Sequence, residues 1–205
     1  MMISAILAFS CAPEQKDDMF DVPQDGYTFF EADFRTVDFD AEAEQFWQKG
    51  IDVGVFGTAE GVNERYTLKK ACDGKAVGEF YGPKVSGDQI VAYYPYSESI
   101  ECVKSDDNYA LEVVLPAEQT YEENSFGNGT WPMVAVSEDN NITFKNVCAL
   151  LSFTLPDNLP ATIEKVTLSS ASAIAGEMDV DYKNDTPSCS MPSGQLKQIT
   201  MTGTF

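Results

Sequence analysis

The sequence predicts an all-β protein, a Greek-key β-sandwich of antiparallel strands with at most one short helix. Two observations predict this class. Apolar residues repeat with a period of two along most of the chain, which is typical of strands with one buried face. Turn signals such as Phe126–Gly129 and Pro192–Gly194 interrupt these runs at intervals of roughly 8–15 residues, a spacing typical of sandwiches.

The predicted strands follow one another from the first aromatic run to the end of the chain. Seven segments have the expected alternation or β-prone composition: residues 27–34, 51–56, 88–94, 111–115, 133–136, 177–183 and 199–204. In the sixth segment, Met178, Val180 and Tyr182 alternate with charged residues, which predicts a half-exposed strand. The one predicted helix is a turn or two at Ala41–Trp47.

Residues 142–155 have a different pattern, because apolar side chains occur at both parities. Val147, Leu151 and Phe153 share one parity, whereas Ile142 and Leu150 share the other. Such a run is expected in a strand that is covered on both sides, or in one with a bulge near Asn146. We therefore predict the central core strand here.

The chain of 205 residues has room for one large domain or two small ones. Residues 1–19 are interpreted as a signal and polar tether, and residues 20–205 as a single β-sandwich domain, since no linker divides them. The last predicted strand runs to Phe205 without a terminating signal. This leaves open a second β-sandwich beyond it.

The composition excludes several classes of function. With 13 basic and 33 acidic residues the net charge is −20, so nucleic acid and anionic lipid are not expected partners. The chain has no histidine, which removes Ser–His and Cys–His nucleophiles and the commonest metal ligand. We expect a protein that is not an enzyme and has no cofactor or metal site.

The N-terminal segment resembles the signal of a bacterial lipoprotein. An apolar stretch over Ile3–Phe9 precedes Ser10 and Cys11, as in a lipobox, which implies that Cys11 is lipidated. Lys16, Asp17 and Asp18 then resemble the acidic export signal of Bacteroidetes lipoproteins. This resemblance implies anchoring on the outer face of the outer membrane. The alternative is a structural, buried Cys11 followed by an ordinary polar tether.

Four further cysteines, Cys72, Cys102, Cys148 and Cys189, match no known disulfide framework. An exported protein could oxidise them, with three possible pairings if all four take part. Cys148 lies in an apolar run and is predicted to be a buried free thiol.

Four segments in order resemble the fimbrillin and Mfa-like family of Bacteroidetes surface lipoproteins. They are FWQKGIDVGVFG (46–57), QIVAYYPYS (89–97), LPAEQTY (115–121) and ITFKNVCALLSFTL (142–155). The resemblance implies transthyretin-like β-sandwich domains and a role as a pilus subunit or adhesin, with other pilin or adhesin subunits as partners. It also implies strand donation, in which an Arg-specific protease removes an early strand and a partner's strand replaces it. The bond between Arg35 and Thr36 follows the first predicted strand and is the hypothesised processing site.

A second functional hypothesis is a surface glycan-binding lipoprotein that captures nutrients. Trp47, Trp131 and Tyr94 are candidates for stacking on sugar rings, and the alternative is that they are core aromatics. Host or dietary glycans, or host proteins, would then be the partners.

Overall fold

A computed structural model describes residues 27–34, 46–59, 61–122, 127–149, 151 and 162–204 of the chain. These residues form fourteen strands and one 3-10 helix, η2 (Lys70–Cys72), so the predicted all-β class is confirmed. Most of the predicted helix at Ala41–Trp47 lies outside the described residues, and Trp47 itself forms an isolated β-bridge with Lys75. The predicted tether, 1–19, also lies outside them, and the single-domain interpretation of 20–205 stays a prediction.

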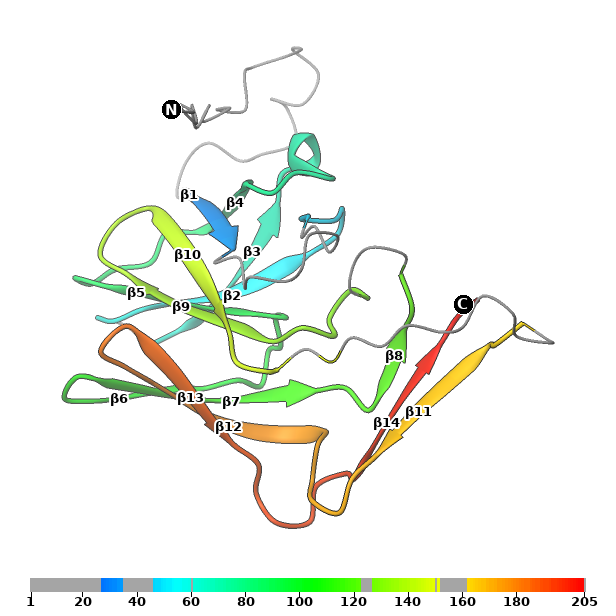
Figure 1. Ribbon diagram of the computed structural model, residues 1–205. Helices are drawn as coiled ribbons and strands as arrows, with labels where there is room; N and C mark the ends of the chain where they lie inside the picture. The colour runs from blue at the N-terminus through cyan, green and yellow to red at the C-terminus, as the bar shows by residue number, and fades with distance from the viewer. Residues whose placement is uncertain are drawn as a thin grey trace, which may run out of the picture.

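Seven strands close into a barrel in the order β1-β10-β9-β5-β2-β3-β4 (Figure 1). Their bounds are β1 Tyr27–Phe34, β2 Asp52–Gly57, β3 Asn63–Leu68, β4 Gly78–Pro83, β5 Ile90–Tyr94, β9 Met133–Ser137 and β10 Asn141–Asn146. Neighbouring strands are antiparallel except β1 and β10, which are parallel. The main sheet thus closes on itself, where the sequence predicted an open layer of a sandwich.

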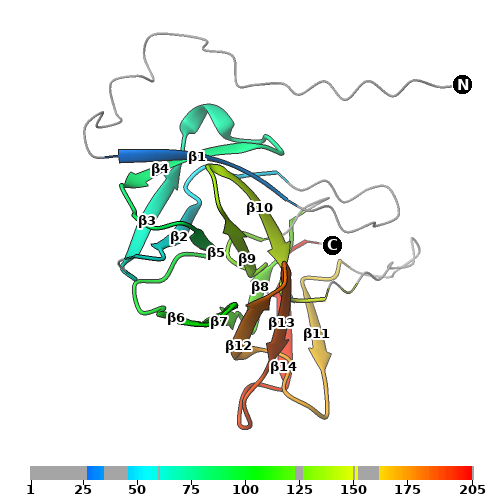
Figure 2. The same cartoon turned by 90° about the vertical axis from the view of Figure 1, so that its left-hand side faces the viewer.

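Two smaller sheets accompany the barrel (Figures 1 and 2). The four-stranded sheet has the order β13-β12-β7-β6 and is antiparallel. Its strands are β6 Cys102–Ser105, β7 Asn108–Leu115, β12 Gly176–Lys183 and β13 Thr186–Ser190. The three-stranded sheet, β11-β14-β8, contains β8 Glu118–Thr120, β11 Lys165–Ser169 and β14 Gln198–Thr202. Its β14 and β8 form the second parallel pair.

The barrel interior is filled by aromatic and aliphatic side chains from all around the wall. Alternate residues of β2 and β5 point inward, among them Val53, Val55, Ala92 and Tyr94. This is the face that the alternation in those two segments predicted. The interior is therefore a packed core rather than a channel.

A second core lies between the outside of the barrel and the four-stranded sheet. The barrel contributes Phe56, Val91, Tyr93 and Val134, which point outward from β2, β5 and β9. The inner faces of β7 and β12 contribute the opposing layer, for example Val113 and Val180. One wall of the barrel is thus covered on both sides, and here two sheets stack as in a sandwich.

The predicted core strand at 142–155 is only partly correct. Strand β10 ends at Asn146, and Val147 and Cys148 form a bend rather than strand. Ile142 and Phe144 are buried as expected, but Leu151 is 66% exposed. Residues 150 and 152–155 lie outside the described part of the chain. The described first part of the apolar run, residues 142–148, therefore belongs to a strand end and the bend that follows it, and β5 is a strand with apolar contacts on both faces.

Candidate functional site

Strand β1 completes the barrel by joining two strands that are otherwise its edges. It pairs antiparallel with β4 from Tyr27 to Ala32 and parallel with β10 from Glu31 to Phe34. Figure 2 shows β1 running across β4 toward β10. Among the described strands, β4 has only β3 as its other partner and β10 has only β9, so the closed barrel depends on β1.

The inward side chains of β1 belong to the barrel core. Phe30 is 3% exposed and stacks on Tyr66 and Phe80, with ring centroids 5.1 and 5.4 Å away. Ala32 is fully buried, and its carbonyl oxygen accepts a hydrogen bond from Trp47 Nε1 at 3.1 Å. The strand is therefore held by backbone pairing, by aromatic stacking and by one buried side-chain hydrogen bond.

Trp47 fixes β1 to the remainder of the core. Its indole lies edge-on to Phe80, Tyr94 and Phe144, with centroids 4.8, 6.3 and 5.7 Å away. Gly78 in β4 leaves room for this ring, because a Cβ there would lie 2.7 Å from Trp47 Cδ1. The residue of β1 paired with Gly78 is Ala32, so two small residues lie side by side at the level where Trp47 packs.

Removing β1 would open two strand edges and a core cavity at once. The backbone groups of β4 and β10 would lose their partners, and the space of Phe30 and Ala32 would be empty. Unpaired strand edges beside apolar pockets are the arrangement that accepts an added strand. The seam formed by β1, β4 and β10 is therefore the first candidate site, and we call it the β1 seam.

The predicted processing residues, Arg35 and Thr36, lie outside the described residues. They follow β1 directly, since the strand ends at Phe34. The only other arginine of the chain, Arg65, lies within β3, where its guanidinium contacts the Asp52 carboxylate. That carboxylate and its hydrogen bond raise the pKa of Arg65. Arg65 therefore belongs to a paired strand of the barrel.

The three aromatics predicted to stack on sugars do not form an exposed platform. Trp47 is fully buried, while Trp131 is 6% and Tyr94 5% exposed. The Tyr94 hydroxyl donates to Asn128 Oδ1 at 2.7 Å, and burial raises its pKa. All three belong to the barrel core, so the prediction of glycan stacking at these residues is wrong. A flat sugar needs an open ring face, which burial removes.

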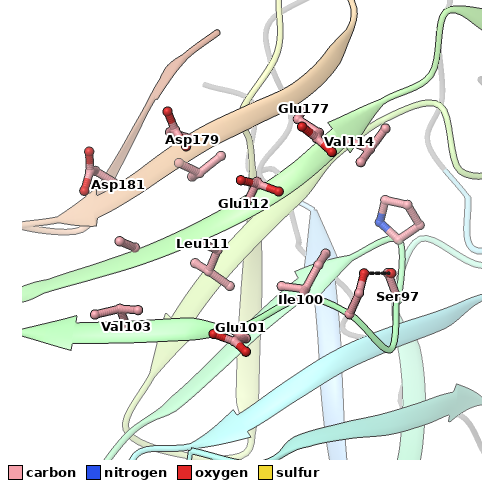
Figure 3. Close-up of a pocket in the computed structure, with 14 residues that line it drawn as sticks. Ser97, Ile100, Glu101, Val103, Leu111, Glu112, Val114, Glu177, Asp179 and Asp181 are labelled. Atoms are coloured by element: carbon pink, nitrogen blue, oxygen red, sulfur yellow. Dashed lines mark hydrogen bonds between the residues drawn. The ribbon is translucent and has the colours of Figure 1, made fainter. Parts of the chain in front are cut away.

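A groove on the outer face of the four-stranded sheet is the second candidate site (Figure 3). It has a volume of about 500 Å³ and crosses β6, β7 and β12. Glu112 of β7 lies directly opposite Asp179 of β12, and Glu177 and Asp181 lie two residues to either side. The side chains of Val103 and Val114, 59% and 50% exposed, add an apolar part. We call this surface the acidic groove.

The acidic groove has a distinctive charge pattern. None of the residues that line it is basic, and none has an aromatic ring. Carboxylates on one face of a strand are about 6–7 Å apart, and only Glu112 and Asp179 face each other directly across the strand pair. Among the described residues, no cluster of three or more His, Cys, Asp or Glu side chains could hold a metal. The groove suits a cationic surface better than a metal ion.

The acidic groove was only half predicted. The alternation of Glu177, Asp179 and Asp181 predicted an exposed charged face, which is confirmed. The sequence contained no signal that Glu112 would lie opposite Asp179, because the two residues are far apart in the chain. Like charges opposite each other destabilise a sheet, so local rules alone argue against this pairing.

The described cysteines occupy three different settings, and all are free thiols. Cys72 is fully buried in the barrel core. Burial raises the pKa of Cys102 to about 11 and that of Cys148 to about 12. Cys148 is half-buried, so the prediction of a buried thiol is only partly correct, and Cys189 is exposed. Cys11, the predicted lipidation site, lies outside the described residues.

Comparison of the chain with protein-family models, with curated proteins and with solved structures finds no match in any of the three. Within the described residues, no helix has the length and apolar character required to cross a membrane.

Proposed function

We propose that the protein is a cell-surface subunit of a pilus, or an adhesin, that assembles with other subunits by β-strand donation. The observation that supports this most directly is the position of β1, the first strand, which closes a barrel between two strands distant in sequence. The order of segments that resembles the fimbrillin and Mfa-like family points the same way. No catalytic step is part of this proposal.

The hypothesised cut would convert the closed barrel into a strand acceptor. Cleavage between Arg35 and Thr36 would leave β1 attached only by hydrogen bonds and packing. An incoming strand could then pair with β4 and β10, as β1 does now. Since donor and β1 make equivalent main-chain bonds, the exchange replaces one set of bonds by another.

The β1 seam also defines what the donor strand must look like. Its backbone must run antiparallel to β4 and parallel to β10. It needs a large aromatic side chain at the level of Phe30 and, two residues later, a small one at the level of Ala32. Side chains on the opposite face, such as Asp33, are exposed and are free to vary.

Anchoring belongs to the same proposal. A lipid on Cys11 would tie the chain to the outer membrane on the N-terminal side of β1. If the cut at Arg35 occurred, the lipid would leave with β1, which would couple release from the membrane to opening of the barrel. Labelling cells with an alkyne fatty acid should mark the wild-type protein and leave Cys11→Ala unmarked.

The experiment that tests the proposal uses the full chain and an Arg-specific protease. We expect one early cut, after Arg35, and a new N-terminus at Thr36, whereas Arg35→Lys stays intact. After β1 is displaced, the open barrel should bind a labelled peptide of residues 27–34 saturably. A matched peptide with Phe30→Asp should not bind, because its carboxylate would enter an aromatic core.

Two outcomes would contradict strand donation. One is a cut only after Arg65, since the barrel would then open at β3. The other is a nicked chain that loses β1 and either unfolds in circular dichroism or fails to bind the wild-type peptide. Saturable, sugar-specific binding without peptide capture would favour the alternative, glycan capture. No described feature favours that alternative at present, because the candidate aromatics are buried and the acidic groove lacks rings.

A further inference from the structure

The end of β10 lies against the hairpin formed by β12 and β13. Lys145, 7% exposed, reaches from β10 to Asp185 in the hairpin turn, where its ammonium contacts both the backbone oxygen and the carboxylate. The same ammonium lies 5.4 Å from the centre of the Tyr182 ring. These contacts hold the barrel wall and the hairpin together just before the bend at Val147 and Cys148.

Two cysteines meet at this junction. Cys189 on β13 lies directly opposite Val180 on β12, so both side chains point to the inner face of the sheet. The Cys189 thiol donates a hydrogen bond to the Val147 carbonyl oxygen at 3.0 Å, one residue from Cys148. The Cys148 sulfur lies 3.8 Å from Met178 Sδ, also on the inner face of β12.

These contacts place both sulfurs over the same short stretch of β12. Met178 is two residues from Val180, so it is the diagonal neighbour of Cys189 across the strand pair. The electrostatic effect of Cys189 on Cys148 agrees with this, because after burial it is the second cause that raises the pKa of Cys148.

We propose that Cys148 and Cys189 form a disulfide that covalently links the bend after β10 to β13. This inference does not depend on strand donation. Among the pairs that the four described cysteines could form, it selects Cys148 with Cys189 and leaves Cys72 and Cys102 as free thiols.

Neither of the other two described cysteines is close enough to Cys189 to pair with it. Cys102 on β6 lies in the same row as Cys189, with Leu111 and Val180 between them, so three strand spacings separate the two. That is about 14 Å, twice the largest Cα separation that a disulfide spans. Cys72 is fully buried inside the barrel, on the other side of the wall.

The chemistry is an exchange with a disulfide oxidant such as oxidised glutathione. The Cys189 thiol is exposed, so after losing its proton it can attack one sulfur of the oxidant. This breaks the oxidant's S–S bond and releases one of its halves as a thiolate. The Cys148 thiolate then attacks the Cys189 sulfur of the mixed disulfide and releases the second half. The protein loses two protons and two electrons, and the oxidant becomes two thiols.

Trypsin makes the pairing easy to identify, because it separates the four described cysteines from one another. Cleavage after lysine places Cys148 in residues 146–165 and Cys189 in 184–197, while Cys72 falls in 71–75 and Cys102 in 85–104. The full chain is reduced, equilibrated with reduced and oxidised glutathione, blocked with N-ethylmaleimide, digested without reductant and analysed by mass spectrometry. We expect one dominant linked species, 146–165 joined to 184–197.

The melting temperature provides a second readout. The Cys148–Cys189 disulfide closes a long loop, so it should raise the melting temperature of the oxidised chain by roughly 5–10 °C over that of the reduced chain. Cys148→Ser and Cys189→Ser should each abolish the linked peptide and this difference, and Cys102→Ser should preserve both. Cys189 is exposed, so its variant should fold even if Cys148→Ser does not.

The proposal is overturned by a linkage of Cys189 to Cys102 or Cys72. It is equally overturned if glutathione remains on Cys189 while Cys148 is alkylated, or if oxidation leaves the four thiols unlinked.

Discussion

Gly54 in β2 lies directly beneath the ring of Tyr93 in β5, its partner across the strand pair. A Cβ at Gly54 would lie well inside van der Waals contact with the ring carbons of Tyr93. The Tyr93 ring is held in place, because it is fully buried and stacks on Phe56 with ring centroids 5.8 Å apart. Its hydroxyl also donates a hydrogen bond to the Ser97 carbonyl oxygen at 2.7 Å. The glycine is thus required by a neighbour rather than by its own backbone angle.

Gly54→Ala is expected to lower the free energy of unfolding by about 2–3 kcal/mol, because the ring must leave its packed position. Urea unfolding followed by circular dichroism measures this. The control is Gly50→Ala. A Cβ there would meet nothing within 4 Å, but Gly50 has a φ of +85°, so about 1 kcal/mol of backbone strain is expected. A loss at Gly54 no larger than at Gly50 would mean that Tyr93 can move aside.

At the scale of single elements, β1 shows that a local sequence pattern can predict the bounds of a strand. Its bounds, Tyr27–Phe34, agree with the predicted segment, and β2, β5 and β12 agree within two residues at either end. Strands β3, β4, β6, β8, β11 and β13 were not predicted. Several of these are short or polar; β13, for example, has the sequence TPSCS and gains its strand state from pairing with β12. Pairing with a neighbour can outweigh a weak intrinsic preference.

Phe30→Ala should test how much β1 contributes to the closed barrel. Loss of a buried ring that stacks on Tyr66 and Phe80 should cost about 3–5 kcal/mol of unfolding free energy. The matched control on the same strand is the exposed Asp33→Ala, with a change within about 0.5 kcal/mol. Denaturant melts of both variants measure the difference. Equal stability of the two would show that β1 does not share in the barrel core.

At the scale of the whole molecule, two cores share one barrel wall, formed by β2, β5 and β9. Inward residues of this wall fill the barrel, and outward residues meet β7 and β12. The second core also removes two cysteine thiols and one tyrosine hydroxyl from water. Burial is the first cause that raises the pKa of Cys102 to about 11, and of Cys148 and Tyr93 to about 12.

Stability of the reduced protein should therefore fall as pH rises from about 9 to about 12. In the unfolded chain the two thiols lose their protons near pH 9.0 and the Tyr93 hydroxyl loses its proton near pH 10.0. The folded chain retains these protons to higher pH. The unfolded state then binds fewer protons, so each step up in pH favours unfolding. Their contribution is fully present below about pH 9.

Urea unfolding in a phosphine reductant at about pH 8 and about pH 11 measures this decline. Cys148→Ser should decline less than wild type, since serine does not ionise in this range, and the exposed Ser190→Ala should decline as wild type does. A flat profile for wild type would show that these groups titrate alike in both states.

The sequence by itself determined the all-β class, the β1 segment and the faces of β2, β5 and β12, because side chains alternate across a strand and burial selects one set. Only the tertiary structure decided that the main sheet closes, that β1 pairs in parallel with β10, and that Trp47, Trp131 and Tyr94 lie inside. It also brought the Cys189 thiol to the Val147 carbonyl, next to Cys148, and Glu112 opposite Asp179. The period-two pattern predicts which side chains share a face of a strand. It does not predict strand partners, because these depend on contacts between residues far apart in the chain.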